Sequence, residues 1–159
     1  EVEFRPFFLC PSSRWEHCRA IDARCESMIG KGLLSEVGSL AAHHGLLSSP
    51  VRLAIGYRQT LEYLQAGDAS PEAFRDYLGK FKAATRRYAK QQQQWWRREE
   101  GVMFVPVDVA LGSDAVAAAA KVVDSMRGLP DAEWKAALAD PEGLNLRTRE
   151  ENKRQGAGM

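Results

Sequence analysis

Apolar residues return every three or four positions through most of this chain, which predicts a succession of amphipathic helices. The first such stretch runs from Trp15 to Ile29. Ser13-Arg14-Trp15-Glu16 precedes it in the form of a capping box, and Gly30 and Gly32 follow its end. These signals predict a first helix with its apolar side toward a core.

The same spacing predicts further helices over 33–44, 54–64, 70–95, 113–126 and 131–138. The fourth is the longest, and Ser70 and Pro71 supply its N-cap and first helical residue. Its apolar positions predict that Phe74, Leu78, Phe81 and Tyr88 are buried.

Two segments, about 2–10 and 102–107, have the composition of strands. Because an isolated pair of strands is marginal in water, we expect both to belong to a parallel sheet with further strands outside this chain. The expected fold class is α/β and helix-dominated, with four to six helices.

Composition excludes several classes of protein. The chain has 159 residues, 45% of them hydrophobic and 27% charged, as in an ordinary globular protein rather than a disordered, collagen-like or membrane-spanning one. We expect one domain over 1–139 and a polar, disordered tail over 140–159. No initiator Met or signal peptide opens the chain, so we expect a piece of something longer.

Cysteine and histidine spacing predicts neither disulfides nor a metal site. The three cysteines, Cys10, Cys18 and Cys25, are an odd number without CxxC spacing. A reducing compartment is therefore expected. His17, His43 and His44 form no metal-ligand pattern.

The net charge is only +1, but its distribution is uneven. Residues 75–98 contain eight basic residues and one acidic residue. Five of the basic residues fall within about 80° on a helical wheel: Arg75, Lys82, Arg86, Lys90 and Arg97. We call them the basic stripe. It predicts a surface that follows a phosphate backbone, an ordinary solvated face being the alternative. Rings at Tyr88, Trp95 and Trp96 could stack on bases or pack in a core.

Two other features could bind anions or RNA. In Ala54-Ile55-Gly56-Tyr57-Arg58-Gln59, the glycine predicts a tight helix start or a close backbone approach. A phenol, a guanidinium and an amide follow it in one turn. Arg24, at the edge of the first helix's apolar face, either reaches solvent or binds an anion through both its amino groups.

No catalytic motif is visible. Gly30-Lys31-Gly32 lacks the glycine and the Ser or Thr of a phosphate-binding loop, and no nucleophile elbow or catalytic dyad occurs. The chain by itself is therefore expected to be inactive.

Taken in order, these segments resemble the tRNA dimethylallyltransferase family, also called tRNA isopentenyltransferases. The resemblance covers about residues 2–108 and rests on four stretches. They are Arg24 with Met28–Val37, Ala54–Gln59, Thr85–Gln92 and Trp95–Arg97. It corresponds to the family's C-terminal half.

The resemblance implies a transferase that moves a dimethylallyl group from its diphosphate to the exocyclic amine of adenine 37 in tRNA. It also implies a core like that of P-loop nucleotide kinases. The nucleotide-binding P-loop, the aspartate proposed as general base and the ligands of Mg²⁺ belong to the N-terminal half, outside this chain. The implied partners are the tRNA anticodon stem-loop and dimethylallyl diphosphate, in the cytoplasm or mitochondrion. No membrane or protein partner is implied.

Residue by residue, Arg24 matches the arginine that contacts the diphosphate. The residues that match tRNA-contacting positions are Gly56, Tyr57, Arg58, Gln59, Arg86, Lys90, Gln92, Trp95 and Arg97. Gln91 and Ala20 stand where many members have a basic residue. The alternatives are a non-catalytic RNA-binding helical module and a protein-interaction domain that uses Trp95 and Trp96.

Overall fold

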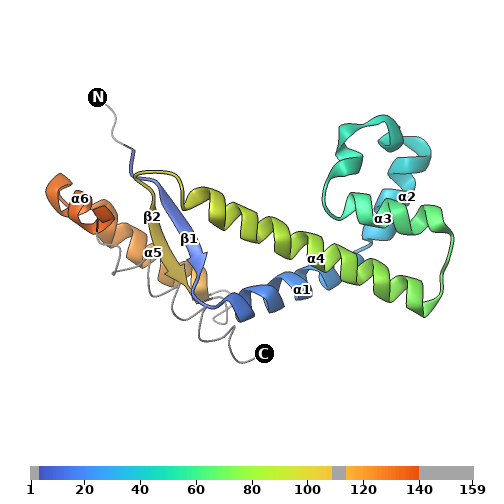
Figure 1. Cartoon of the computed structure of the whole chain (residues 1–159), viewed down its shortest axis with the longest axis horizontal. Coiled ribbons are helices and arrows are strands. Elements are labelled where there is room, and N and C mark those ends of the chain that lie inside the picture. Colours follow the sequence, from blue (N-terminus) through green and yellow to red (C-terminus); the bar gives the residue numbers. More distant parts are fainter. Residues whose placement is uncertain (1–3, 109–113, 140–159) are drawn as a thin grey trace. The chain divides into compact units, whose positions relative to one another are not determined.

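The computed structural model describes residues 4–108 and 114–139, and these contain six α-helices, two short 3-10 helices and two strands (Figure 1). In chain order the elements are β1 Phe7–Pro11, α1 Arg14–Gly30, α2 Leu33–His43, η1 Leu46–Ser48, η2 Pro50–Leu53, α3 Tyr57–Ala66, α4 Pro71–Trp96, β2 Met103–Val107, α5 Asp114–Arg127 and α6 Asp131–Ala139. The prediction of a helix-dominated α/β chain is confirmed. The expected tail lies outside the described residues.

The boundaries of the predicted strands need correction at their starts. The first strand begins at Phe7, and Phe4 is 85% exposed. Strand pairing begins where the backbone N–H of Met103 donates to the carbonyl of Pro6 at 3.0 Å. The second strand begins at Met103, one residue later than predicted.

The strands β1 and β2 pair with each other in parallel, with Phe7 opposite Met103 and Pro11 opposite Val107. Alternate side chains enter two apolar clusters. Phe8, Cys10 and Phe104 pack with Trp96, while Met103 and Val105 pack with Trp134 of α6. The parallel pairing agrees with the expected α/β fold, and the membership of both strands in a larger sheet stays a prediction.

The described residues form two compact units, one of residues 4–18, 91–108 and 114–139 and the other of residues 19–90. Helices α1 and α4 contribute to both. In the first unit the Arg5 guanidinium closes the turn between α5 and α6. It donates to the carbonyl of Leu129 at 2.5 Å and to Asp131 at 2.6 Å, and it lies 5.3 Å from the centre of the Trp134 ring.

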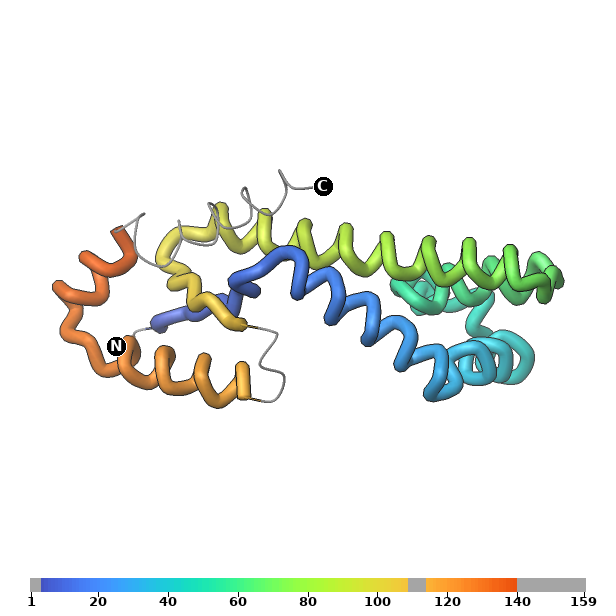
Figure 2. The backbone as a smooth tube through the Cα atoms, turned by 90° about the horizontal axis from the view of Figure 1, so that it is seen from below, coloured from blue at the N-terminus to red at the C-terminus, as the bar shows by residue number. Residues whose placement is uncertain are grey.

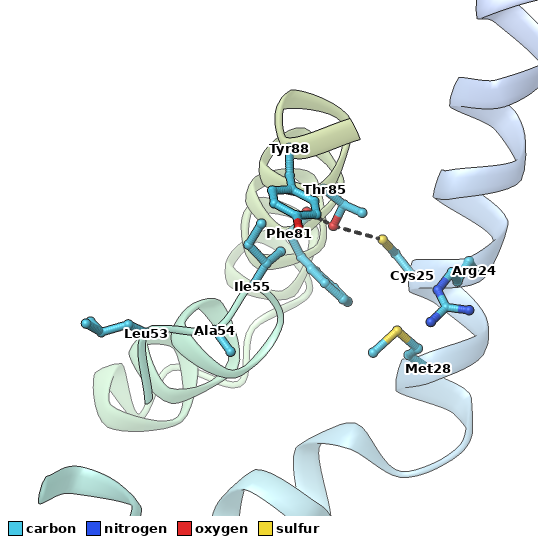
Figure 3. Close-up of a pocket in the computed structure, with 9 residues that line it drawn as sticks. All are labelled: Arg24, Cys25, Met28, Leu53, Ala54, Ile55, Phe81, Thr85 and Tyr88. Atoms are coloured by element: carbon cyan, nitrogen blue, oxygen red, sulfur yellow. Dashed lines mark hydrogen bonds between the residues drawn. The ribbon is translucent and has the colours of Figure 1, made fainter. Parts of the chain in front are cut away.

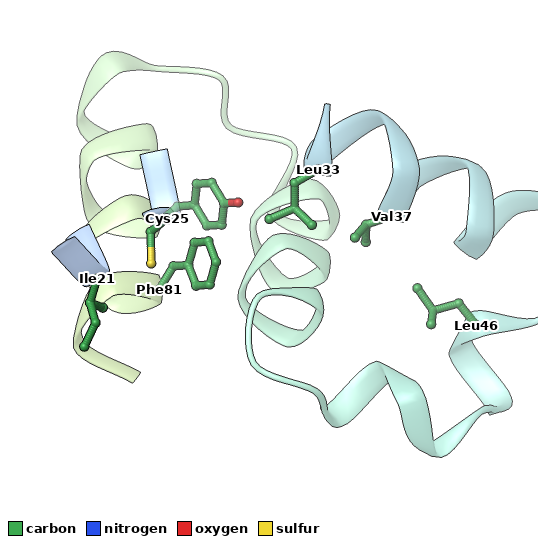
Figure 4. Close-up of a cluster of buried hydrophobic side chains, with 7 residues drawn as sticks. Ile21, Cys25, Leu33, Val37, Leu46 and Phe81 are labelled. Atoms are coloured by element: carbon green, nitrogen blue, oxygen red, sulfur yellow. The ribbon is translucent and has the colours of Figure 1, made fainter. Parts of the chain in front are cut away.

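The second unit has its own core, built where α1, α2 and α4 meet (Figure 4). Its buried residues are Ile21, Cys25, Leu33, Val37, Leu46, Tyr77 and Phe81. The pattern along α4 predicted Phe81 correctly but not Tyr77, whose hydroxyl is hydrogen-bonded to that of Thr60 at 2.7 Å. The predicted burial of Tyr88 is wrong, since its side chain is 51% exposed.

Within this unit α1 and α4 run side by side in opposite directions (Figure 2). Both helices begin as their sequences predict. Ser13 Oγ accepts from the backbone N–H of Glu16, and Ser70 Oγ accepts from that of Ala73, each at 3.2 Å. These caps satisfy backbone donors that the first turn of a helix leaves free.

Candidate functional site

The turn that starts α3 is held in an unusual backbone conformation. Gly56 has φ 93° and ψ −58°, and a Cβ atom there would lie 3.2 Å and 3.3 Å from two carbons of the Phe81 ring. The positive φ favours glycine, and the close approach to the Phe81 ring leaves little room for a side chain. The prediction of a tight start with a close backbone approach is therefore confirmed.

The sequence predicted that Gln59 presents its amide to solvent. In the structure this side chain instead maintains the turn. Gln59 is buried, and its Oε1 accepts from the backbone N–H of Gly56 at 2.8 Å. Because one end of the amide is already occupied inside the fold, we remove Gln59 from the set of residues expected to contact RNA directly.

Tyr57 and Arg58 are the two side chains that the turn directs outward. Tyr57 is half-buried, and its hydroxyl donates to the carboxylate of Glu36 on α2. That hydrogen bond raises the pKa of the phenol. Arg58 is exposed, and its Nε lies 3.9 Å from a carboxylate oxygen of Glu62, a loose pair that leaves the guanidinium available.

The basic stripe is not one continuous exposed face, which corrects the prediction. Lys82 Nζ lies 2.5 Å from Glu26, and Arg86 Nη1 lies 2.5 Å from Asp22. Both acids belong to α1, so these two cations pair with α1 and are only partly exposed. Arg75 pairs within α4 with Glu72.

Complementary spacing could have revealed this pairing. Asp22 and Glu26 are four residues apart on one predicted helix, and Lys82 and Arg86 are four apart on another. Such pairs match when two helices pack in opposite directions. The pattern along α4 alone gives the face of each cation but not which acids of another helix meet it.

Lys90 remains exposed, and within the described part of the chain it has no acidic partner. Arg87 is exposed as well. On α4, these two cations are available to an anionic ligand.

The remaining predicted residues lie in the first unit. Gln92 is half-buried, Arg97 is exposed just after α4, and Trp95 is 52% exposed. Trp96 instead packs on Phe8, with ring centroids 5.8 Å apart. The proposed patch of two tryptophans therefore reduces to one exposed ring.

Arg24 lies at a cavity of about 430 Å³ within the second unit (Figure 3). Its lining is Arg24, Cys25, Met28, Leu53, Ala54, Ile55, Phe81, Thr85 and Tyr88. Arg24 is exposed, and within the described residues no acid pairs with it. Most of the other lining residues are apolar, so the cavity combines a hydrophobic wall with a single guanidinium.

The cavity's thiol is unsuited to act as a nucleophile. Cys25 Sγ donates to Thr85 Oγ1 at 3.6 Å, and burial raises the pKa of this thiol. The helical wheel places Arg24 beside Met28 on the first helix, but it does not show that Thr85 of α4 lines the same cavity. The helical period gives their faces, but not which helix faces which.

Metal ligands and a membrane span are both absent from the part of the chain that the structure describes. Residues 4–108 and 114–139 hold no group of three or more His, Cys, Asp or Glu side chains that could ligate a metal ion. None of the described helices combines the length and apolar character needed to cross a bilayer.

Comparison with known proteins identifies the family. Residues 1–99 match the family model described as IPP transferase. The chain belongs to the IPP transferase family. The match covers the Arg24 cavity, the Gly56 turn and all of α4.

Named relatives agree with this assignment. The tRNA dimethylallyltransferase 9 of Arabidopsis thaliana is 42% identical over 108 residues, which are 62% of this chain and 23% of that protein. A tRNA dimethylallyltransferase of Legionella pneumophila (strain Corby) is 37% identical over 120 residues, 74% of this chain and 37% of that protein. The chain therefore spans well under half the length of these relatives.

A solved member shares the fold. The crystal structure of the full-length tRNA isopentenylpyrophosphate transferase from Bacillus halodurans aligns with a TM-score of 0.61 at 21% identity. The alignment covers 95% of this chain and 41% of that one. At this level of identity the likeness establishes the fold of this member of the IPP transferase family.

Proposed function

We propose that this chain is part of a tRNA dimethylallyltransferase, which moves a dimethylallyl group from dimethylallyl diphosphate to the exocyclic amine of adenine 37. The observation that carries the proposal is the family match over residues 1–99. The exposed Arg24 at an apolar cavity supports it, as do the exposed cations Arg58 and Lys90.

In the proposed reaction a bond forms between the adenine nitrogen and the first carbon of the dimethylallyl group. The bond from that carbon to the diphosphate oxygen breaks, and the diphosphate leaves with the electron pair. Arg24 is assigned to the diphosphate, since a guanidinium can hold the negative charge that develops on these oxygens. The amine proton goes to a base outside this chain.

The tRNA-binding role is assigned to two sets of residues, one in each unit. The second unit contributes the Gly56–Arg58 turn and Lys90, and the first contributes Gln92, Trp95 and Arg97. Cations hold phosphates, and an exposed ring can stack on an unpaired base. Adenine 37 must leave its stack to react, which costs a few kcal/mol that these contacts would offset.

The described residues supply no set of ligands that suits Mg²⁺, so we assign that ion to parts of the enzyme outside this chain. The proposed compartments are those that contain tRNA, the cytoplasm or the mitochondrion.

The test is a transfer assay with the complete gene product that contains this chain. Purified protein is incubated with tRNA and isotopically labelled dimethylallyl diphosphate, and label in tRNA is counted. The proposal expects label on the amine of adenine 37. Binding of tRNA without transfer would instead identify a non-catalytic RNA-binding module. A protein that neither binds tRNA nor transfers the label would refute both the transferase and the RNA-binding module.

A further inference from the structure

The phenol of Tyr57 is fixed by a carboxylate from another helix. Tyr57 is the first residue of α3, and its hydroxyl donates to Oε1 of Glu36, which lies in the first turn of α2. Helices α2 and α3 belong to the same compact unit. The hydrogen bond therefore links the outward side chain of the turn to a separate element of the fold.

The backbone of this turn is already rigid without that link. Gly56 packs on Phe81, and its N–H is bound by the buried side chain of Gln59. The remaining freedom lies in the side-chain torsions of Tyr57, which only partly packs against the core. Glu36 is the described residue whose hydrogen bond restricts the position of the phenol oxygen.

The negative charge of Glu36 does not favour RNA binding at the neighbouring turn. An exposed carboxylate near phosphates repels them, so it would lower RNA affinity. A carboxylate does stabilise the start of α2 through the helix dipole, and the cap residue there, Gly32, supplies no side-chain hydrogen bond. That stabilisation requires a charge near the helix start but no bond to Tyr57.

We propose that Glu36 is a positioning residue for RNA recognition: it holds the Tyr57 phenol in the orientation in which the Gly56–Arg58 turn meets RNA. This inference rests on the proposed function. It assigns Glu36 a role through a hydrogen bond, which can be separated from its role as a charge.

The test compares Glu36→Ala with Glu36→Gln in the complete gene product. The probe is a synthetic tRNA anticodon stem-loop, and its affinity is measured at one fixed salt concentration. A glutamine oxygen can still accept from the phenol, whereas alanine cannot. We expect Glu36→Ala to weaken binding about three- to tenfold and Glu36→Gln to bind nearly as the wild type.

Other outcomes of this pair overturn the proposal. Equal weakening by both variants would mean that the charge at the start of α2 matters and the bond to Tyr57 does not. Wild-type affinity in both would mean that the orientation of the phenol has no effect on binding.

A matched control and a double variant isolate the path through Tyr57. Glu62→Gln removes a carboxylate near the same turn without touching the phenol, so we expect unchanged or tighter binding. In the background of Tyr57→Phe, Glu36→Ala should weaken binding no further. A further loss of the same size would show that Glu36 acts by another route and would overturn the proposal.

Failure of the proposed function is distinguishable from failure of this inference. Arg58→Ala and Lys90→Glu are tested beside the other variants. If both bind like the wild type, the proposed interface is wrong and the inference is overturned with it. If both weaken binding but Glu36→Ala does not, the positioning role alone is refuted.

Discussion

A Cβ atom on Gly56 would approach Cε2 of Phe81 to 3.2 Å, closer than ordinary van der Waals contact. The backbone of α3 thus begins directly on the core of the second unit. The same glycine has a positive φ of 93°, so position 56 is restricted both by conformation and by space.

We therefore expect Gly56→Ala to destabilise α3 by about 2–4 kcal/mol, combining backbone strain with overpacking against Phe81. Gly67, which ends the same helix at φ 67°, serves as the control, because a Cβ atom added there would meet no other atom within 4 Å. Gly67→Ala should cost only the backbone part, about 1–2 kcal/mol. Hydrogen exchange of the α3 amides in the native protein measures the loss of helix stability in each variant. Equal losses in Gly56→Ala and Gly67→Ala would mean that contact with Phe81 is unimportant.

The ion pair between Arg86 and Asp22 should stabilise the packing of α1 on α4. Both side chains are about one-third exposed, so we expect a coupling energy of about 1 kcal/mol. Arg86→Asp should lower the free energy of unfolding, and adding Asp22→Arg should restore part of it. The cycle is measured by urea unfolding, and additive losses in the double variant would contradict a direct pair.

Elements were predictable from the sequence because caps and helical period are local signals. Ser70 and Pro71 fixed the start of α4 from residues adjacent to it, and the structure places the helix there. The partners of Lys82 and Arg86 were not predictable in the same way. They lie more than fifty residues away on α1, and only the packing of the two helices brings them together.

In the candidate site, too, features that depend on local signals were predictable and features that depend on packing were not. Gly56 was recognisable as a structurally required residue, because glycine lowers the stability of a helix unless the backbone needs it there. The inward turn of Gln59 was not recognisable, since its polar side chain has the same pattern whether it faces solvent or caps the backbone. The predicted burial of Tyr88 was wrong for a related reason. Helical period placed Tyr88 on the apolar side of α4, but the cavity beside Arg24 leaves its side chain exposed.

Stability of the second unit should fall as the pH rises through the alkaline range. Burial raises the pKa of the Cys25 thiol and that of the Tyr77 phenol above their ordinary values. The unfolded chain therefore loses these protons at a lower pH than the folded chain does, so it binds fewer protons and is favoured as the pH increases. At neutral and acidic pH the two groups are protonated in both states and contribute no pH dependence.

The measurement for this prediction is the free energy of unfolding at about pH 8 and about pH 10 in the wild type and in Cys25→Ala. The variant should lose less stability between the two pH values, although its absolute stability is lower because alanine fills less space. An identical decrease in both proteins would show that the Cys25 thiol does not contribute.

Arg24→Ala should impair use of the donor more than binding of tRNA. Loss of one charge-assisted hydrogen bond costs about 1.5–3 kcal/mol, so kcat/KM for dimethylallyl diphosphate should fall roughly tenfold to a hundredfold. Steady-state kinetics with varied donor and a separate tRNA-binding measurement check this. Weaker tRNA affinity with unchanged donor kinetics would show that Arg24 has been assigned to the wrong ligand.

The claim that this chain supplies a tRNA-binding surface is tested most directly by the salt dependence of tRNA affinity in two charge reversals on α4. Lys90 is exposed without an acidic partner among the described residues, whereas Lys80 lies 2.7 Å from Asp76 and is already paired. Lys90→Glu should weaken binding and reduce the slope of log affinity against log salt by about one unit, while Lys80→Glu leaves both nearly unchanged. Equal and negligible effects of the two reversals, in proteins with unaltered circular dichroism, would contradict the account.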